Sequence, residues 1–168
     1  MKADTVAPDS LCEVTNPHRV YFIRHGETAW SLSGQDTGRT DLPLTPRGES
    51  MARCLASTLS GISFSLVLTS PRRWTRSTCA LAGVGGAAQA EPSLTERDDG
   101  DYEGLHTAEI REQHPGWGVW ADGCPRGAIP ADVCARADEL ITRLKALTGK
   151  AALSRIIALW DAAAKVSP

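Results

Sequence analysis

Residues 20–26 place two side chains that can act on a phosphate group next to each other. Arg24 and His25 follow the apolar run Val20–Ile23, and Gly26 follows them. In open α/β sheets, ligands bind at the carboxyl ends of the strands. A neutral imidazole can attack phosphorus as a nucleophile, and a guanidinium can bind two phosphate oxygens at once. Taken alone, this tripeptide is also typical of a surface histidine that follows a core strand.

Further segments along the chain extend the pattern. Residues 33–45 are polar and contain glycine, and Leu68–Pro71 is typical of a strand end that runs into a helix. Leu94–Glu96 precedes an acidic stretch. Together with Arg24-His25-Gly26, these segments resemble the histidine phosphatase superfamily, also called phosphoglycerate-mutase-like. The resemblance covers about residues 18–148.

The resemblance implies a role for each matching residue. His25 is expected to become phosphohistidine, Arg24 to bind the transferred phosphoryl group, and Glu96 to protonate the leaving alkoxide. Substrate binding is expected at three positions of the segment after Gly26: Ser31, Thr37 and Gly38. The expected partner is a small phosphorylated substrate, and the resemblance implies neither a metal ion nor an organic cofactor.

Three positions depart from the family pattern. Trp74 stands where the family has a second phosphate-binding Arg, and Trp carries no charge. No His follows His114, so the family's second catalytic His has no counterpart. Asp36 stands where the family usually has His or an aromatic residue, and a carboxylate there repels phosphate unless it points to solvent or pairs with Arg39.

These features predict a hydrolase whose activity is impaired. The expected reaction is hydrolysis of small phosphomonoesters, such as sugar phosphates, through a phosphohistidine intermediate. The alternative is a protein without catalytic activity, either a phosphate-binding pseudo-phosphatase or a truncated product. A separate basic patch, Arg72, Arg73 and Arg76, suits either an anionic ligand or a solvated helix face.

The elements that position these residues follow a strand–helix alternation. Strands are expected at residues 18–23, 66–69 and 89–90. Helices are expected from a cap at Thr45 to Leu59, from a cap at Ser70 to Gly83, from a cap at Thr107 to before Pro115, and over residues 131–148. The chain between residues 116 and 130 is expected to be irregular. This order indicates an α/β fold, a three-layer sandwich in which helices flank a mainly parallel sheet.

The two ends of the chain differ from the region between them. Residues 1–17 are polar and are expected to be a flexible leader, residues 18–148 to be the histidine-phosphatase-like domain, and residues 149–168 to be an atypical tail. Apolar residues in the tail recur at helical spacing, so a helix is predicted over residues 151–164. The family has a core strand here, beside the strand that ends at Ile23. The fold is therefore expected to be incomplete at its carboxyl-terminal end and marginally stable.

Composition limits the class of protein. The 168 residues carry a net charge of −2, which gives no global basic field for nucleic acid or an anionic membrane. No apolar stretch is long enough for a membrane span, and the amino-terminal segment lacks the apolar core of a signal peptide. The five cysteines show no Cys-x-x-Cys spacing, which favours reduced thiols in a cytoplasmic protein. The oligomeric state is left open.

Overall fold

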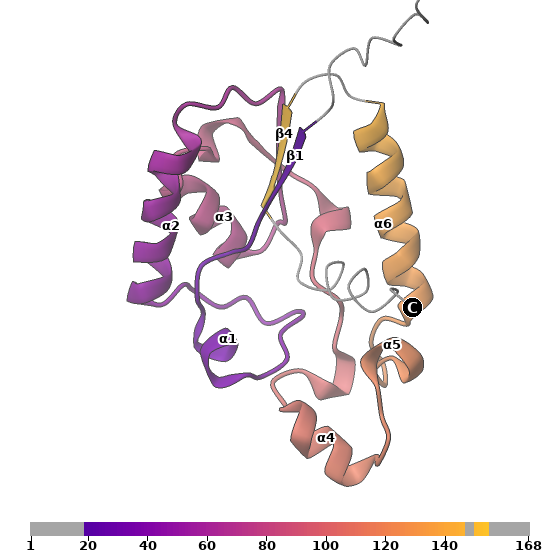
Figure 1. Ribbon diagram of the computed structural model, residues 1–168. Coiled ribbons are helices and arrows are strands. Elements are labelled where there is room, and N and C mark those ends of the chain that lie inside the picture. The colour runs from indigo at the N-terminus through magenta and orange to yellow at the C-terminus, as the bar shows by residue number, and fades with distance from the viewer. Residues whose placement is uncertain (1–18, 147–149, 155–168) are drawn as a thin grey trace, which may run out of the picture.

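A four-stranded parallel sheet organises the chain, and the computed structural model describes residues 19–146 and 150–154. The strands are β1 (Arg19–Ile23), β2 (Leu66–Thr69), β3 (Ala88–Ala90) and β4 (Lys150–Ser154), in the order β1-β4-β2-β3. Helices α2 and α3 cover one face of the sheet and α6 covers the other (Figure 1). The three-layer α/β prediction is confirmed.

Six α-helices and three short 3₁₀ helices lie between these strands within the described residues. The α-helices are α1 (Ala29–Ser33), α2 (Pro46–Leu59), α3 (Arg73–Leu81), α4 (Thr107–Gln113), α5 (Val119–Asp122) and α6 (Pro130–Lys145). The 3₁₀ helices are η1 (Gly85–Ala87), η2 (Pro92–Leu94) and η3 (Gly100–Tyr102). The segment 116–130, predicted to be irregular, therefore contains α5.

Local sequence sets where these helices begin. The Thr45 hydroxyl accepts a hydrogen bond from the Gly48 amide at 3.0 Å, and Pro46 fills the first position of α2, as predicted. The prediction for α3 is wrong by two residues, because Arg72 rather than Ser70 is the N-cap. The prediction for α4 is wrong by one residue, because His106 is the N-cap and Thr107 is already helical.

Strand β4 corrects the prediction for the tail. Residues 150–154, where the predicted helix begins, are extended and lie between β1 and β2, with Ala152 opposite both Tyr21 and Val67. A short apolar run is compatible with either a strand or a helix, because periodicity does not separate the two over so few residues. The gap expected beside β1 is therefore filled, and the reason for expecting marginal stability disappears. The rest of the predicted helix and the predicted leader lie outside the described residues.

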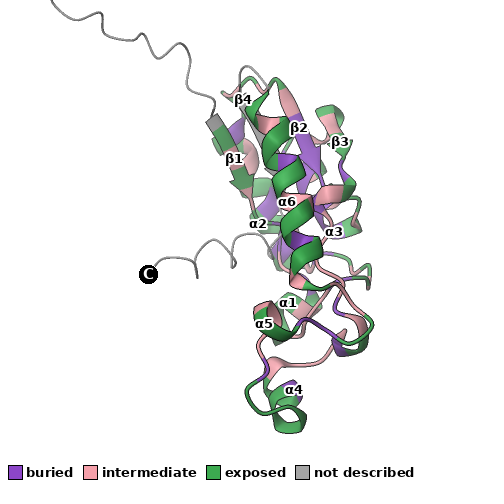
Figure 2. Cartoon of the chain, turned by 90° about the vertical axis from the view of Figure 1, so that its right-hand side faces the viewer, coloured by how far each residue is buried: buried purple, intermediate pink, exposed green. Residues whose placement is uncertain are grey.

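The main core lies between the sheet and α6. Leu68 and Leu94 pack against Val133 and Leu140, which stand two helical turns apart on α6. The opposite side of α6 is exposed along its length (Figure 2). A second cluster lies around α4 and α5 and consists of Tyr102, Ile110, Trp117 and Cys124. The sheet core thus holds the strand ends in place, and the smaller cluster supports the loops beyond them.

Candidate active site

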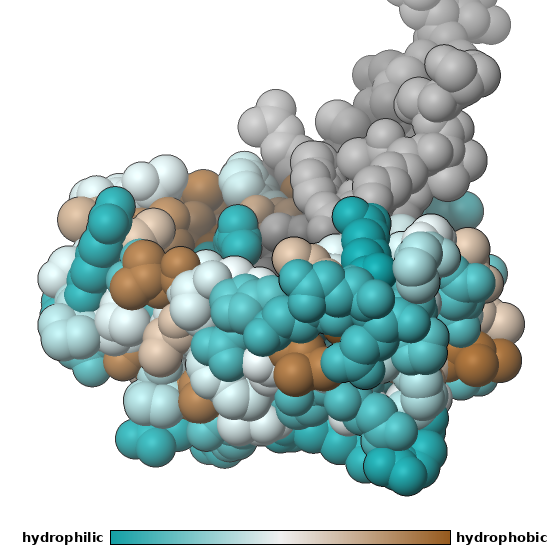
Figure 3. Space-filling model, turned by 90° about the horizontal axis from the view of Figure 1, so that it is seen from below, coloured by the Kyte–Doolittle hydropathy of each residue, from teal (hydrophilic) through white to brown (hydrophobic). Residues whose placement is uncertain are grey.

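A cavity of about 340 Å³ lies at the carboxyl end of β1. Four of the predicted site residues line it together, namely Arg24, Ser31, Thr37 and Glu96. The other lining residues come mainly from the two loops that flank them: Trp30, Gly34, Gln35, Asp36, Arg97, Asp99, Thr107, Val119 and Trp120. This end of the molecule is mostly hydrophilic, with scattered hydrophobic patches (Figure 3). The topology thus brings together residues that are far apart in the sequence.

His25 lies directly after β1 and is only 9% exposed. Its Nδ1 lies 2.7 Å from the Gly26 carbonyl oxygen. A carbonyl oxygen only accepts, so Nδ1 carries the proton in this contact and the lone pair of the neutral ring lies on Nε2. In this tautomer the unprotonated ring nitrogen is Nε2. His25 itself is not part of the cavity lining, whereas its neighbour Arg24 is.

The turn after His25 depends on two glycines that cross at close range. A Cβ on Gly26 would lie 2.4 Å from the Gly48 carbonyl oxygen, and one on Gly48 would lie 2.2 Å from the Glu27 carbonyl oxygen. The Gly26 amide also donates to the hydroxyl of Thr78, a fully buried residue of α3. Thr78 was not predicted from the sequence. It fixes the turn after His25 against α3.

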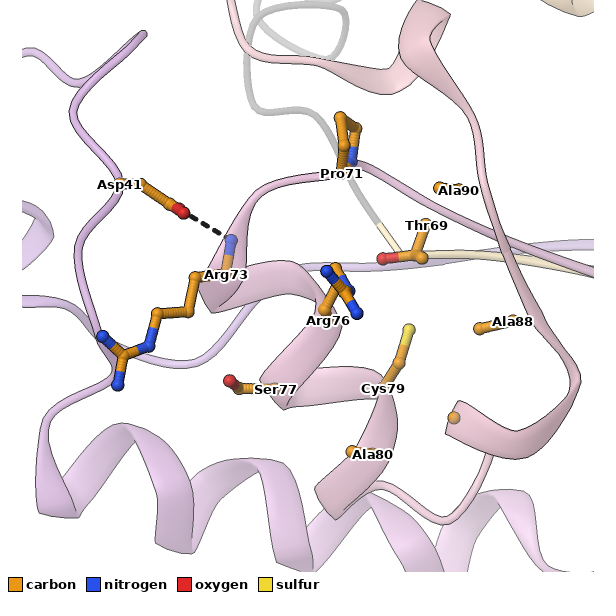
Figure 4. Close-up of a pocket in the computed structure, with 11 residues that line it drawn as sticks. Asp41, Thr69, Pro71, Arg73, Arg76, Ser77, Cys79, Ala80, Ala88 and Ala90 are labelled. Atoms are coloured by element: carbon orange, nitrogen blue, oxygen red, sulfur yellow. Dashed lines mark hydrogen bonds between the residues drawn. The ribbon is translucent and has the colours of Figure 1, made fainter.

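Trp74 occupies the position where a second Arg was expected. Its side chain is 2% exposed, and its ring centroid lies 5.9 Å from that of His25. The neighbouring Arg73 lines a different cavity, between α3 and β3 (Figure 4). No side chain of α3 therefore lines the cavity beside Arg24.

Gly38 does not present its amide to the cavity. The Glu103 carboxylate accepts hydrogen bonds from three consecutive amides, those of Gly38, Arg39 and Thr40, at 2.8–3.1 Å. The predicted contact between the Gly38 amide and phosphate is therefore not available in this arrangement. Partial burial alone would raise the pKa of Glu103, but these amide hydrogen bonds outweigh it and hold the pKa below its usual value.

The Ser31 hydroxyl lines the cavity while it stabilises α1. It accepts a hydrogen bond from the Thr28 amide at 2.8 Å, and the Ser31 amide donates to the Thr28 hydroxyl at 3.1 Å. This reciprocal pair caps the five-residue helix α1. Thr37, the other predicted substrate contact, donates only a long 3.4 Å hydrogen bond to the Gln35 carbonyl.

Three carboxyl groups line the cavity, those of Asp36, Glu96 and Asp99. Glu96 lies beside Arg97, whose guanidinium pairs with Asp99 and donates to the Cys124 sulfur. Burial raises the pKa of Asp99 to about 7, against the attraction of Arg97. Burial also raises the pKa of Asp36.

Asp36 meets neither of the two conditions under which its carboxylate would not repel phosphate. Asp36 lines the cavity rather than pointing to bulk solvent, and Arg39 pairs with Asp98 instead. The cavity therefore combines two guanidinium groups with three carboxyl groups, of which Asp36 and Asp99 have raised pKa values. Electrostatic repulsion of an anionic ligand is weakest at a pH at which the Asp36 and Asp99 carboxyls are both protonated.

Residues 19–146 and 150–154 contain neither a metal-binding cluster nor a helix that could span a membrane. No group of three or more His, Cys, Asp or Glu side chains there is arranged to hold a metal ion. No helix in that part of the chain has the length and apolar character that a membrane span requires.

Comparison with known proteins identifies the family. A family model described as the histidine phosphatase superfamily (branch 1) matches residues 20–157. The chain belongs to this superfamily. The predicted phosphoglycerate-mutase-like fold is confirmed by solved structures of the same kind. One is an open reading frame from Mycobacterium tuberculosis, with a TM-score of 0.76 and 38% identity over 83% of this chain and 74% of that one. Another is the α-ribazole phosphatase of Shigella flexneri, with a TM-score of 0.71 and 28% identity over 82% of this chain and 73% of that one.

Curated relatives of this chain include two phosphatases. An acid phosphatase of Mycobacterium tuberculosis is 43% identical over 126 residues, which cover 74% of this chain and 62% of the relative. The sedoheptulose 1,7-bisphosphatase of Saccharomyces cerevisiae is 36% identical over 156 residues, which cover 79% of this chain and 57% of the relative. The chain thus spans less than two thirds of the length of these relatives.

Proposed function

We propose that this chain hydrolyses small phosphomonoesters, with sugar phosphates as one class, through a phosphohistidine formed on His25. The observation that carries the proposal is the convergence of Arg24, Ser31, Thr37 and Glu96 on one cavity beside His25. These residues supply a cation, two hydroxyls and a carboxyl group, the groups that phosphoryl transfer from an ester requires.

The reaction follows from the position of the proton on His25. With Nδ1–H held by the Gly26 carbonyl, the Nε2 lone pair attacks phosphorus while the ester P–O bond breaks. Glu96 donates its proton to the leaving alkoxide, and Arg24 balances the charge on the phosphoryl oxygens. A water molecule then gives its proton to Glu96 and attacks phosphorus, the P–N bond breaks, and inorganic phosphate leaves.

We also propose that the rate is low. Trp74 is neutral and lies against the His25 ring, where an Arg would add charge to the phosphate site. Loss of an arginine that stabilises phosphoryl transfer costs about 10³-fold or more in rate. The second His of the family has no counterpart in the sequence.

A second candidate function is phosphate-ligand binding without turnover. The observation that favours it is the number of carboxyl groups in the cavity lining, where Asp36 and Asp99 join Glu96. Such a protein would bind a phosphate ester at Arg24 but would not form phosphohistidine.

A phosphatase assay separates the two functions. Purified protein is assayed with p-nitrophenyl phosphate and a panel of sugar phosphates, and rapid acid-free quenching tests for labelled phosphohistidine. We expect turnover that His25→Ala abolishes and that His114→Ala, an exposed histidine at the end of α4, retains. Equal rates for the two variants would overturn the assignment of His25. Phosphate binding without turnover in the parent protein would support the binding function instead.

A further inference from the structure

We propose that the cavity between α3 and β3 is a second binding site, for a phosphate group, separate from the cavity beside His25. Its volume is about 850 Å³, and it is bounded by α3, the end of β2 and the face of β3 (Figure 4). The basic patch singled out in the sequence contributes two of its lining residues, Arg73 and Arg76.

The two arginines give this cavity a positive charge. They stand one turn apart on α3, and Arg76 extends over the space in front of Thr69 (Figure 4). No carboxylate in the described part of the chain forms an ion pair with either guanidinium. Guanidinium groups bind phosphate oxygens through charge-assisted hydrogen bonds. An anion that enters the cavity therefore meets the Arg76 guanidinium, whereas the Arg73 side chain extends away from Thr69 and Ala90 (Figure 4), and neither guanidinium is neutralised by a described carboxylate.

One carboxylate in the lining opposes an anion, and the structure shows how it is held. Asp41 accepts a hydrogen bond from the Arg73 backbone amide at 2.7 Å. The lining therefore carries two positive side chains and one negative one. The hydroxyls of Thr69 and Ser77 add neutral polar groups to the same walls.

Small residues keep the rest of the cavity open. Ala80, Ala88 and Ala90 project little into it. Gly85 approaches α3 closely in this lining, because a Cβ at Gly85 would lie 2.7 Å from the Ala80 Cα. The space is large enough for a phosphate group together with a small organic part.

The opposite faces of α3 separate this site from the one beside His25. Trp74 and Thr78 are buried toward His25 and Gly26, whereas Arg73 and Arg76 line the other side. The two cavities share no lining residue. Occupancy of the α3–β3 cavity therefore does not depend on Arg24.

The test uses the whole chain with uniform ¹⁵N labelling and follows the arginine Nε–Hε signals while inorganic phosphate is added. We expect the signals of Arg73 and Arg76 to move in a saturable manner. The variant Arg76→Gln should weaken this response at Arg73 about tenfold, as expected for the loss of a charge-assisted contact. The matched control is Arg53→Gln, an exposed arginine on α2 that pairs with Glu49. Arg76→Lys, which keeps the charge, should bind phosphate better than Arg76→Gln.

The same titration separates this site from the proposed active site. In Arg24→Gln, the Arg73 and Arg76 signals should still respond to phosphate, whether or not the chain has phosphatase activity. Glucose 6-phosphate is titrated in parallel, and stronger binding of either probe identifies free phosphate or a phosphate ester as the better ligand. The proposal is overturned if Arg73 and Arg76 do not respond, or if Arg76→Gln binds phosphate as Arg53→Gln does.

Discussion

Replacing Glu103 by Gln should release the loop that carries Thr37 and lower the stability of the fold. The carboxylate of Glu103 accepts from three consecutive amides, and Gln keeps one neutral acceptor oxygen for all three. A hydrogen bond to a charged group contributes about 1.5–3 kcal/mol, and the amides of residues 39 and 40 are partly open to water, so we expect a loss of about 2–4 kcal/mol in the free energy of unfolding. Glu112→Gln, an exposed residue of α4, is the control.

The stabilisation by Glu103 is expected to depend on pH. The folded-state pKa of Glu103 is lowered, so its contribution is complete above the unfolded-state value of about 4.3 and is lost as the pH falls through the lower folded-state pKa. Urea unfolding at pH 7 should therefore separate Glu103→Gln from the parent protein, and the difference should shrink in acid. Amide exchange at residues 38–40 should become faster in the variant. If Glu103→Gln and Glu112→Gln unfold at the same urea concentration at pH 7, the three amide contacts do not support the loop.

Two further substitutions and one titration test other parts of the site. Trp74→Arg should raise phosphate affinity by about tenfold through a new charge-assisted contact, measured by titration calorimetry, and an unchanged affinity would mean that position 74 does not reach the ligand. The Asp99 carboxyl, followed by ¹³C NMR, should titrate near pH 7, because its pKa is raised by burial to about 7, and a midpoint near 4 would contradict the buried environment. Gly26→Ala should lower stability by about 1–3 kcal/mol or more, because its Cβ would lie 2.4 Å from the Gly48 oxygen, whereas Gly86→Ala meets no atom within 4 Å and should unfold like the parent in urea.

Features that depend on neighbouring residues were predictable from the sequence. The start of α2 was predictable from Thr45 and Pro46, because a helix cap needs only a hydroxyl and the backbone amides of the next few residues. The alternation of strands and helices gave the three layers, and the motif ending at Gly26 lies at the carboxyl end of β1, where the sequence placed it. Four predicted residues accordingly meet at one cavity.

Features that depend on distant contacts were not predictable. Glu103 lies 65 positions from Gly38, and nothing local distinguishes it from the other acidic residues of its segment. Thr78 lies 52 positions from Gly26, and a threonine inside a helix gives no signal that its hydroxyl holds a turn elsewhere. The short apolar run of β4 was assigned to a helix because its pairing with β1 and β2 is a property of the assembled sheet.

The position of β4 has a consequence for how the chain folds during synthesis. In the described sheet β1 pairs only with β4, and β2 pairs with β3 and β4, so β1 has no partner strand until residues 150–154 have left the ribosome. Pairing of segments so far apart carries a large loop-closure cost, and folds dominated by such contacts assemble slowly. Before it pairs with β4, β1 exposes the apolar side chains of Val20 and Phe22, which are still 38% and 59% exposed in the folded structure. Until residues 150–154 have been made, the nascent chain therefore carries an apolar, unpaired strand, which is the kind of segment that chaperones bind and that aggregates when chaperones are scarce.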